Sequence, residues 1–311
     1  MLTILVIVAP VFALVTTGYL AVHFNACPRS GIPGLLAFVN NFAVPILLFR
    51  AMLDIDFAAV FNPKMIAGYY FSALIVLVSA IVIARALFRN RPGEAVASAF
   101  GAYFSNTVLL GLPIVQRAYG DEALPVMYSI IGFHAPTLMT VSLIAMEISR
   151  RDGAGAGHVA ALAIRRIFTH PLLIGIALGL LGNLFGIALI EPADAFTRMM
   201  AQAVLPTALF GLGGALHDYR VRDNWLLSAT MSLIKLMAMP ALVFFVVAVV
   251  LGVDHDIAKI AVITSAMPSG INAYVFATSY NRSVEVAASS ILITTALSVV
   301  TVSFWLYVLA L

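Results

Sequence analysis

Hydrophobic segments of membrane-spanning length fill almost the whole chain. A transmembrane helix needs about 20 mainly apolar residues. Ten segments meet this requirement, at residues 2–24, 32–53, 64–88, 95–119, 124–148, 167–190, 195–216, 225–251, 257–280 and 285–310. Only 10% of the 311 residues are charged, whereas a soluble domain carries about 25%, so the chain cannot cover a globular surface in water. The sequence therefore predicts an all-α polytopic membrane protein with ten transmembrane helices.

Lysine and arginine residues orient the ten spans. Eleven of the 17 lie in or beside odd-numbered loops and five beside even-numbered loops, while Lys235 lies inside the eighth span. The positive-inside rule places the odd-numbered loops in the cytoplasm. The first segment has no basic region and no cleavage site, which favours a span over a signal peptide. We expect a multi-pass protein of the cell membrane, the inner membrane in a bacterium, with both termini extracytoplasmic.

A weak internal repeat divides the chain. The segments FAVPILLF and AVLPTALF place Pro45 and Pro206 161 residues apart. The same offset relates five spans in residues 1–149 to five spans in residues 167–311, with a cytoplasmic linker at 150–166. Because each half has an odd number of spans, the second half enters the membrane from the opposite side. Such a 5+5 inverted repeat is typical of secondary transporters.

The fourth and ninth spans, which correspond in the repeat, carry helix-breaking and polar residues at membrane depth. Proline lacks a backbone N–H, and broken backbone is tolerated in a membrane only inside protein or beside a wet cavity. A proline can be a simple kink, but matched breaks in inverted halves indicate a midplane binding site. The N-termini of half-helices carry partial positive charge, which suits a carboxylate. The candidate substrate-binding residues in these spans are Asn106, Thr107, Pro113, Pro268, Ser269 and Asn272.

Four further polar residues lie within predicted spans. Asn41 precedes Pro45 by one turn, and Gln202 occupies the equivalent region of the seventh span. Both are candidates for the substrate cavity, although buried amides also join helices together. His134 is either a packing residue or a proton relay. Lys235 lies too deep for easy snorkelling, which leaves three interpretations: a neutral amine, a partner of helix C-terminal carbonyls, or a replacement for a bound cation.

Several chemistries are absent from the sequence. No acidic residue lies in the middle of a span, so proton coupling would use His134, Lys235 or the substrate. Sodium could bind through carbonyl and hydroxyl oxygens freed at the breaks. The single cysteine, Cys27, excludes a multi-cysteine zinc site, and no HExxH, GxSxG or P-loop motif is present. We therefore expect no metal centre, no organic cofactor, no nucleic-acid partner and no enzyme activity.

The segments NNFAVPILLF, SNTVLLGLPIVQRAYG and AMPSGINAYVFATSYN resemble the best-marked motifs of the auxin efflux carrier family. This family includes bacterial organic-acid carriers and plant PIN-type auxin exporters, and the resemblance covers essentially the whole chain. It implies a fold akin to sodium/proton antiporters and bile-acid symporters, in which broken helices 4 and 9 cross. It also implies a scaffold of helices 1, 2, 6 and 7, a transport domain of helices 3–5 and 8–10, and substrate contacts from Asn106 and Asn272.

The favoured function is a secondary transporter that moves small organic anions by an elevator-like, alternating-access mechanism. The substrate is expected at the crossing of helices 4 and 9. A sodium-coupled organic-anion or bile-acid-like symporter is the alternative, and a channel is disfavoured because no helix carries a polar stripe. Malonate, another short carboxylate or an aromatic acid such as an auxin would fit. Besides the anion and membrane lipid, no partner is specified; the direction, the coupling ion and the oligomeric state, including a homodimer, stay open.

Overall fold

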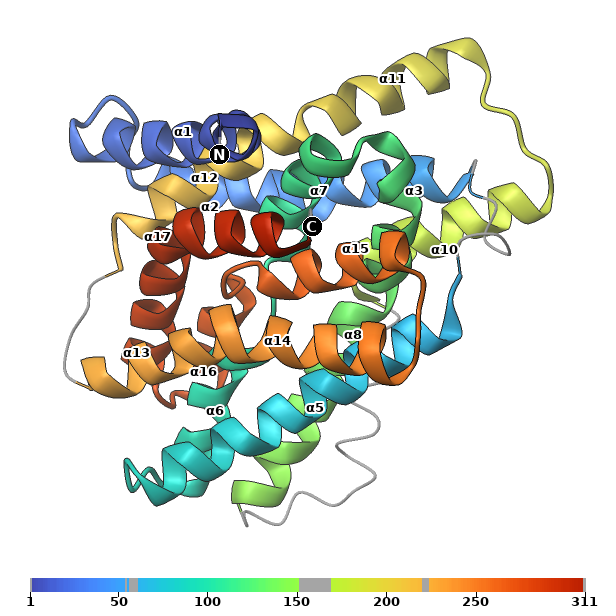
Figure 1. Cartoon of the computed structure of the whole chain (residues 1–311). Coiled ribbons are helices and arrows are strands. Elements are labelled where there is room, and N and C mark those ends of the chain that lie inside the picture. The colour runs from blue at the N-terminus through green and yellow to red at the C-terminus, as the bar shows by residue number, and fades with distance from the viewer. Residues whose placement is uncertain (1, 54, 56–60, 151–168, 220–223, 310–311) are drawn as a thin grey trace.

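The computed structural model describes residues 2–53, 55, 61–150, 169–219 and 224–309, which form a nearly all-helical structure without a β-strand (Figure 1). Seven helical segments in these ranges are long and apolar enough to cross a membrane. They are Val6–His23, Gly31–Leu53, Pro63–Ala86, Asp121–Ser149, Glu191–Leu216, Trp225–Val250 and Val284–Leu309. Each corresponds to one predicted span, which confirms the prediction of a helical, multi-pass membrane protein.

Prolines and cap residues set several helix starts in the first part of the chain. α5 begins at Pro63 behind Asn62, whose side-chain oxygen accepts a hydrogen bond from the N–H of Met65 at 3.0 Å. Proline suits the first turn because its missing N–H would have no partner there. The elements are α1 (Leu2–His23), α2 (Gly31–Phe38), η1 (Val39–Ala43), α3 (Val44–Leu53), α5 (Pro63–Ala86), α6 (Pro92–Tyr103), η2 (Thr107–Gly111), α7 (Leu112–Tyr119), η3 (Asp121–Ala123) and α8 (Leu124–Arg150).

The second part of the chain begins with α10, again at a proline. Its elements are α10 (Pro171–Leu184), α11 (Glu191–Gln202), α12 (Val204–Leu216), α13 (Trp225–Leu233), η4 (Ile234–Ala238), α14 (Met239–Val243), η5 (Phe244–Val250), α15 (His255–Ala266), α16 (Asn272–Tyr280) and α17 (Val284–Leu309). The elements η1, η2, η4 and η5 are π-helical turns. Such turns often lie at functional sites, and here η1 contains Asn41 and η4 contains Lys235.

The three remaining predicted spans are shorter or interrupted. In the fourth, α6 ends at Tyr103 and the helix resumes at Thr107. In the ninth, α15 ends at Ala266 and α16 begins at Asn272. In the sixth, α10 has 14 residues; residues 151–168, and with them most of the predicted cytoplasmic linker, lie outside the described residues. The count of ten spans and the division into two halves stay predictions.

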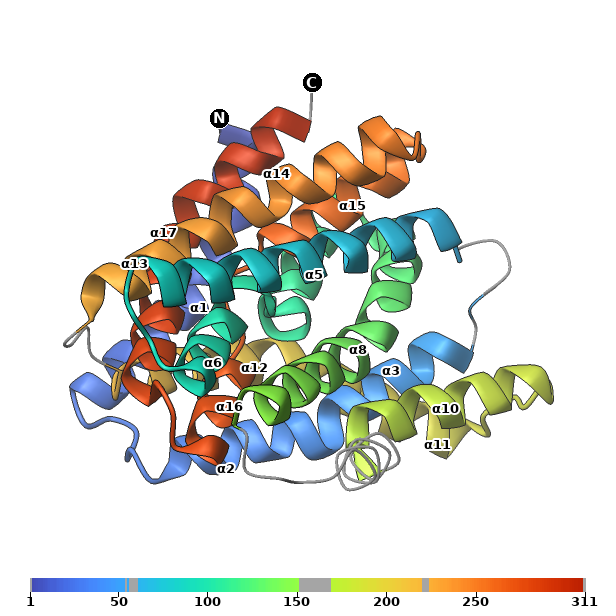
Figure 2. The same cartoon turned by 90° about the horizontal axis from the view of Figure 1, so that it is seen from below.

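Two helix pairs pack unusually closely through glycine. α1 lies against α12, and α10 lies against α3, as Figure 2 shows for the second pair. A Cβ atom on Gly18 of α1 would clash with the carbonyl oxygen of Phe210 in α12. A Cβ atom on Gly179 of α10 would clash with the carbonyl oxygen of Phe49 in α3. Small residues let helix backbones approach in this way within membranes.

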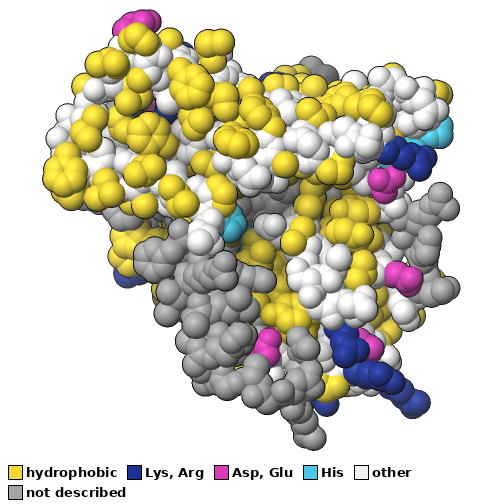
Figure 3. Space-filling model, turned by 180° about the vertical axis from the view of Figure 1, so that it is seen from behind, with side chains coloured by type: hydrophobic (Ala, Val, Ile, Leu, Met, Phe, Trp, Pro, Cys, Tyr) yellow, Lys and Arg dark blue, Asp and Glu magenta, His cyan; other side chains and the backbone are white. Residues whose placement is uncertain are grey.

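The outer surface is largely apolar. On the face drawn in Figure 3, hydrophobic side chains cover much of the described surface, and the few charged side chains lie mostly toward its margins. Exposed residues such as Phe71, Leu178 and Val300 are more than half accessible in the isolated chain. Their exposure is expected when lipid rather than water surrounds the helices.

Candidate functional site

The two helix interruptions meet in space. The backbone N–H of Asn106 donates a hydrogen bond to the carbonyl oxygen of Pro268 at 2.8 Å. Ser105 and Ser269 form an isolated antiparallel bridge at the same point. The two segments therefore satisfy each other's backbone groups where neither continues its helix, as an apolar surrounding requires. We call this meeting point, formed by Ser105, Asn106, Pro268 and Ser269, the junction.

Four helix ends surround the junction. α6 and α15 end there, while η2 and α16 begin there. The side-chain oxygen of Asn106 caps η2 by accepting a hydrogen bond from the N–H of Leu109 at 3.2 Å. Helix N-termini carry a partial positive charge and C-termini a partial negative charge. The junction can therefore stabilise an anion at the starts of η2 and α16 and a cation at the ends of α6 and α15.

A cavity of about 220 Å³ lies beside the junction. Its wall is formed by η1, residues 104–109, the middle of α8, the first turn of α10 and residues 270–275. Five residues proposed from the sequence line this cavity, which we call the junction cavity: Asn41, Asn106, Thr107, His134 and Asn272. Residues that are distant in the sequence thus meet around one space bordered by both helix breaks.

Three other proposed residues do not line the junction cavity. Pro113 is buried in the first turn of α7. Pro268 accepts the bond from Asn106 through its carbonyl oxygen. The hydroxyl of Ser269 donates to the carbonyl oxygen of Gly101 at 2.5 Å, and its N–H donates to Oγ1 of Thr294 at 3.1 Å. These contacts make Pro113, Pro268 and Ser269 part of the framework of the breaks.

Gln202 lies in a different place from the one the sequence suggested. It lines a second cavity of about 360 Å³, together with Leu47, Gln116, Tyr128 and Arg198 among others. This cavity lies between the middle of α3, α7, the start of α8, and the region where α11 passes into α12. The repeat therefore placed Asn41 and Gln202 in equivalent spans, but their side chains face two separate cavities.

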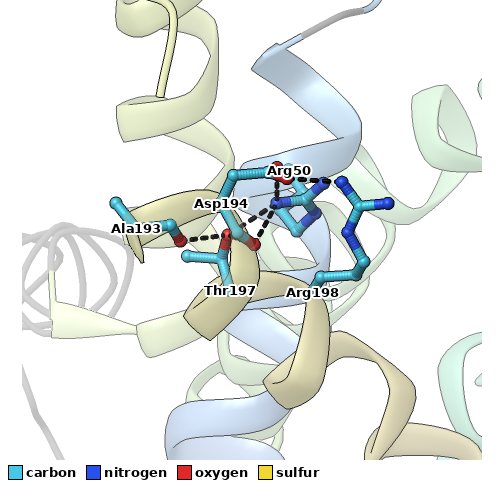
Figure 4. A network of polar contacts seen from close by, with 5 residues as sticks. All are labelled: Arg50, Ala193, Asp194, Thr197 and Arg198. Atoms are coloured by element: carbon cyan, nitrogen blue, oxygen red, sulfur yellow. Dashed lines mark hydrogen bonds and ion pairs between the residues drawn. The ribbon is translucent and has the colours of Figure 1, made fainter. Parts of the chain in front are cut away.

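A polar network ties α3 to α11 next to the second cavity (Figure 4). Nη1 of Arg50 lies 2.6 Å from Oδ1 of Asp194 and donates to Oγ1 of Thr197 at 2.6 Å. Arg198 also forms an ion pair with Asp194. The single carboxylate of Asp194 is thus shared by two guanidinium groups, and it fixes Arg198 at the wall of the second cavity.

Lys235 is completely buried and reaches both helix breaks. Its Nζ donates to the carbonyl oxygen of Ser265 at 2.5 Å and to the hydroxyl oxygen of Ser105 at 2.8 Å. In a continuous helix the carbonyl of Ser265 would accept from the N–H of Ser269, but that N–H donates to Thr294 instead. Of the three interpretations left open, pairing with a helix C-terminal carbonyl is the one these contacts favour.

His134 contacts the junction from α8. Its Nε2 accepts a hydrogen bond from the backbone N–H of Ser105 at 3.2 Å, and its ring meets the Phe104 ring edge-on at 4.7 Å between centroids. Ser105 was not among the residues proposed from the sequence, although it touches both His134 and Lys235. Its position directly before Asn106, at a predicted helix break, was the sequence feature that could have indicated its role.

Comparison with known proteins agrees with this architecture. The profile of the family described as "Membrane transport protein" matches residues 3–306. The chain belongs to this family, the auxin efflux carrier family. The match extends over α1 to α17, so the helix breaks, the junction and both cavities all lie within the family domain.

Individual relatives within the auxin efflux carrier family differ in name. A Rhizobium meliloti protein, provisionally named a malonate transporter, is 26% identical over 306 residues, which cover 97% of this chain and 95% of that protein. The Arabidopsis thaliana protein named auxin efflux carrier component 8 is 21% identical, with 91% of each chain covered. The mouse lysosomal cholesterol signaling protein is 26% identical over 95% of this chain, but the match spans only 36% of the mouse protein.

Proposed function

We propose that this protein is a secondary transporter of small organic anions and that a substrate carboxylate binds in the junction cavity. The observation that carries the proposal is the meeting of two helix N-termini with Asn106 and Asn272 at one cavity. Amide N–H groups and helix N-termini donate hydrogen bonds and favour negative charge. The absence of mid-span acidic residues in the sequence avoids repulsion of an anion.

The size of the junction cavity favours a short acid. At about 220 Å³, it is smaller than the roughly 300–1,000 Å³ typical of pockets for drug-sized ligands. The name of the Rhizobium meliloti relative agrees with a short dicarboxylate. Malonate is therefore the first substrate to test, ahead of an aromatic acid such as an auxin.

Glycine packing supports two inverted halves and the ten-span arrangement. Adding the repeat offset of 161 to Gly18 and Phe49 gives Gly179 and Phe210. The contact of Gly18 with Phe210 is thereby related to the contact of Gly179 with Phe49. Each contact joins a helix of one half to a helix of the other. An inverted repeat accounts for this correspondence, because it makes α1 equivalent to α10 and α3 equivalent to α12, so that the two contacts are equivalent.

An elevator-like movement is proposed from the same packing. The closely packed helices α1, α3, α10 and α12 belong to predicted helices 1, 2, 6 and 7, and would form the scaffold. The junction belongs to predicted helices 4 and 9 and would move with the transport domain. The junction cavity lies between Asn41 on the scaffold side and Asn106, His134 and Asn272 on the transport side. A rigid-body shift at this boundary would carry the anion without opening a continuous pore.

The orientation of the junction cavity is proposed from the loop charges. The cavity includes the first turn of α10, which follows the arginine-rich fifth loop, so we place its opening on the cytoplasmic side. A cysteine introduced at Arg89, after Cys27 is replaced, should be protected from an impermeant maleimide in intact cells. A cysteine at Asp121 should be labelled. The reverse pattern would place both termini in the cytoplasm and contradict the orientation.

Transport activity provides the direct test of the proposed function. Purified protein in proteoliposomes should take up labelled malonate faster when unlabelled malonate is present inside, because a carrier exchanges substrate across a single alternating site. Malonamide, which lacks the charges, should neither exchange nor compete. Malonate uptake without such acceleration would indicate a channel. Failure of malonate, succinate and indole-3-acetate to bind or exchange would contradict the proposal.

A further inference from the structure

The hydrogen bond from Ser105 determines the protonation of His134. A backbone N–H can only donate, so Nε2 of His134, which receives it at 3.2 Å, must be the unprotonated nitrogen of the ring. A neutral imidazole then carries its proton on Nδ1. This nitrogen is buried and has no hydrogen-bond partner among the described residues. A side chain of the junction cavity thus holds an unused donor.

The side-chain amide of Asn106 also has an unused donor, because its other polar atom is engaged as an acceptor. Its Oδ1 accepts the N–H of Leu109 at 3.2 Å, which assigns the other terminal atom of the amide as the NH₂ group. Within the part of the chain that the structure describes, that Nδ2 is also buried without a hydrogen-bond partner. Buried polar groups are nearly always paired, since an unpaired one loses its bonds to water without replacement. Two unpaired donors on residues that line one cavity therefore point to a ligand with acceptor atoms.

The surroundings of His134 hold its ring in place. Phe104 packs against it edge-on, and the rings of Tyr69 and Tyr70 from α5 lie 6.1 and 6.5 Å away between centroids. The remaining titratable groups near it are Lys235, which contacts the same Ser105, and His170 across the cavity. None of these groups is an acid that would stabilise a protonated imidazole.

We propose that neutral His134 and Asn106 bind one substrate carboxylate together, with Nδ1–H and Nδ2–H donating to its two oxygens. This inference rests on the proposed function and specifies its anion-binding groups. His134 is then a substrate-binding residue with a fixed proton. It differs from a proton relay, which must gain and lose a proton during each cycle.

Two substitutions separate the donor from the acceptor of His134. In His134→Asn, the amide NH₂ lies near the former Nδ1 and keeps a donor at that position, but the acceptor for Ser105 is lost. In His134→Gln, the amide oxygen reaches the former Nε2 and keeps the bond from Ser105, but the donor at the Nδ1 position is lost. Malonate affinity of each purified variant is measured by isothermal calorimetry, and folding by thermal unfolding without ligand.

The expected affinity pattern follows from the loss of one hydrogen bond to a charged group. His134→Gln should unfold at a temperature close to wild type but bind malonate about tenfold more weakly or worse. His134→Asn should bind within a factor of about three, even if it unfolds at a lower temperature. Wild-type affinity in folded His134→Gln would overturn the inference, while malonate binding by the wild type would leave the proposed function standing.

The pH dependence distinguishes a fixed donor from a proton relay. A histidine that protonates with the anion would raise malonate affinity as the pH falls from about 8 to about 6.5, and both variants would abolish that rise. The proposal instead requires that the wild type and His134→Asn share the same pH profile over this range. A pH response that is present in the wild type and missing in His134→Asn would overturn the inference.

Discussion

Replacing Lys235 with methionine is expected to lower malonate affinity at least about tenfold and to make transport respond to sodium. Nζ of Lys235 donates to the C-terminal end of α15 through Ser265 and contacts the α6 break through Ser105. Methionine matches the length of the stem but removes the donor that both oxygens share, which leaves them only the longer bond from Oγ of Ser105 to the carbonyl oxygen of Ser265 at 3.4 Å; an impaired buried acceptor costs up to about 1–3 kcal/mol. A monovalent cation could then occupy the vacated position, whereas the wild type should need none.

The matched control is Lys259→Met. Lys259 is a lysine of the ninth span that pairs with Asp256 in the first turn of α15, away from the break. Proteoliposomes clamped with valinomycin report the charge moved, and each unit charge corresponds to about 2.3 kcal/mol per 100 mV. An anion carrier without a coupling ion should be electrogenic and should favour export from an inside-negative cell. Electroneutral transport, with Lys235→Met indistinguishable from Lys259→Met, would contradict this account of the driving force.

Asn106→Asp is expected to abolish malonate binding while leaving the fold intact. A carboxylate oxygen can replace Oδ1 as the acceptor for the N–H of Leu109, and aspartate is among the best helix caps. The substitution removes the Nδ2 donor and adds a negative charge to the cavity, so a dianionic substrate loses a charge-assisted hydrogen bond and meets repulsion. The first effect alone corresponds to about 1.5–3 kcal/mol, or roughly tenfold to a hundredfold in affinity.

Two companion variants test the interpretation of Asn106→Asp. Asn106→Ala removes both the cap and the donor, so it should lower the unfolding temperature as well as the affinity. Asn272→Ala, on the second half-helix, should weaken malonate binding about tenfold without affecting the cap of η2. If Asn106→Asp and Asn272→Ala both bind malonate as the wild type does, the substrate does not bind in the junction cavity.

The local features of the breaks could be predicted from the sequence because they depend on local chemistry. Proline cannot donate to a helix, and asparagine caps one, so the residues of SNTVLLGLP and AMPSGIN are enough to indicate interruptions. Asn41 was selected because Pro45 lies one turn away, and Asn106 and Asn272 because they lie at the breaks and match the family motifs; all three line the junction cavity. Hydrophobic length likewise predicted the seven long helical segments.

The contacts between distant segments could not be predicted in the same way. The bond between Lys235 and Ser105 joins residues 130 positions apart, and nothing in either local sequence specifies the other. Gln202 illustrates the same limit, because equivalence in a repeat relates backbone positions while the neighbouring helices decide which cavity a side chain enters. Ser105 was overlooked because serines in membrane helices usually donate a hydrogen bond to the backbone of their own helix, as Ser72 does to the carbonyl oxygen of Gly68.

The glycine contacts also constrain how the chain is assembled during synthesis. Gly18 can contact Phe210 only after about 190 further residues have been synthesised. At a synthesis rate of roughly 5–20 residues per second, α1 would therefore spend some 10–40 s in the membrane without α12. Lipid tolerates this interval because a helix with a glycine-lined face leaves no polar group unsatisfied. Neither α1 nor α3 can complete its packing within the first half of the chain. The nascent N-terminal helices therefore remain loosely associated in the bilayer, and tight packing is delayed until α10 and α12 are inserted.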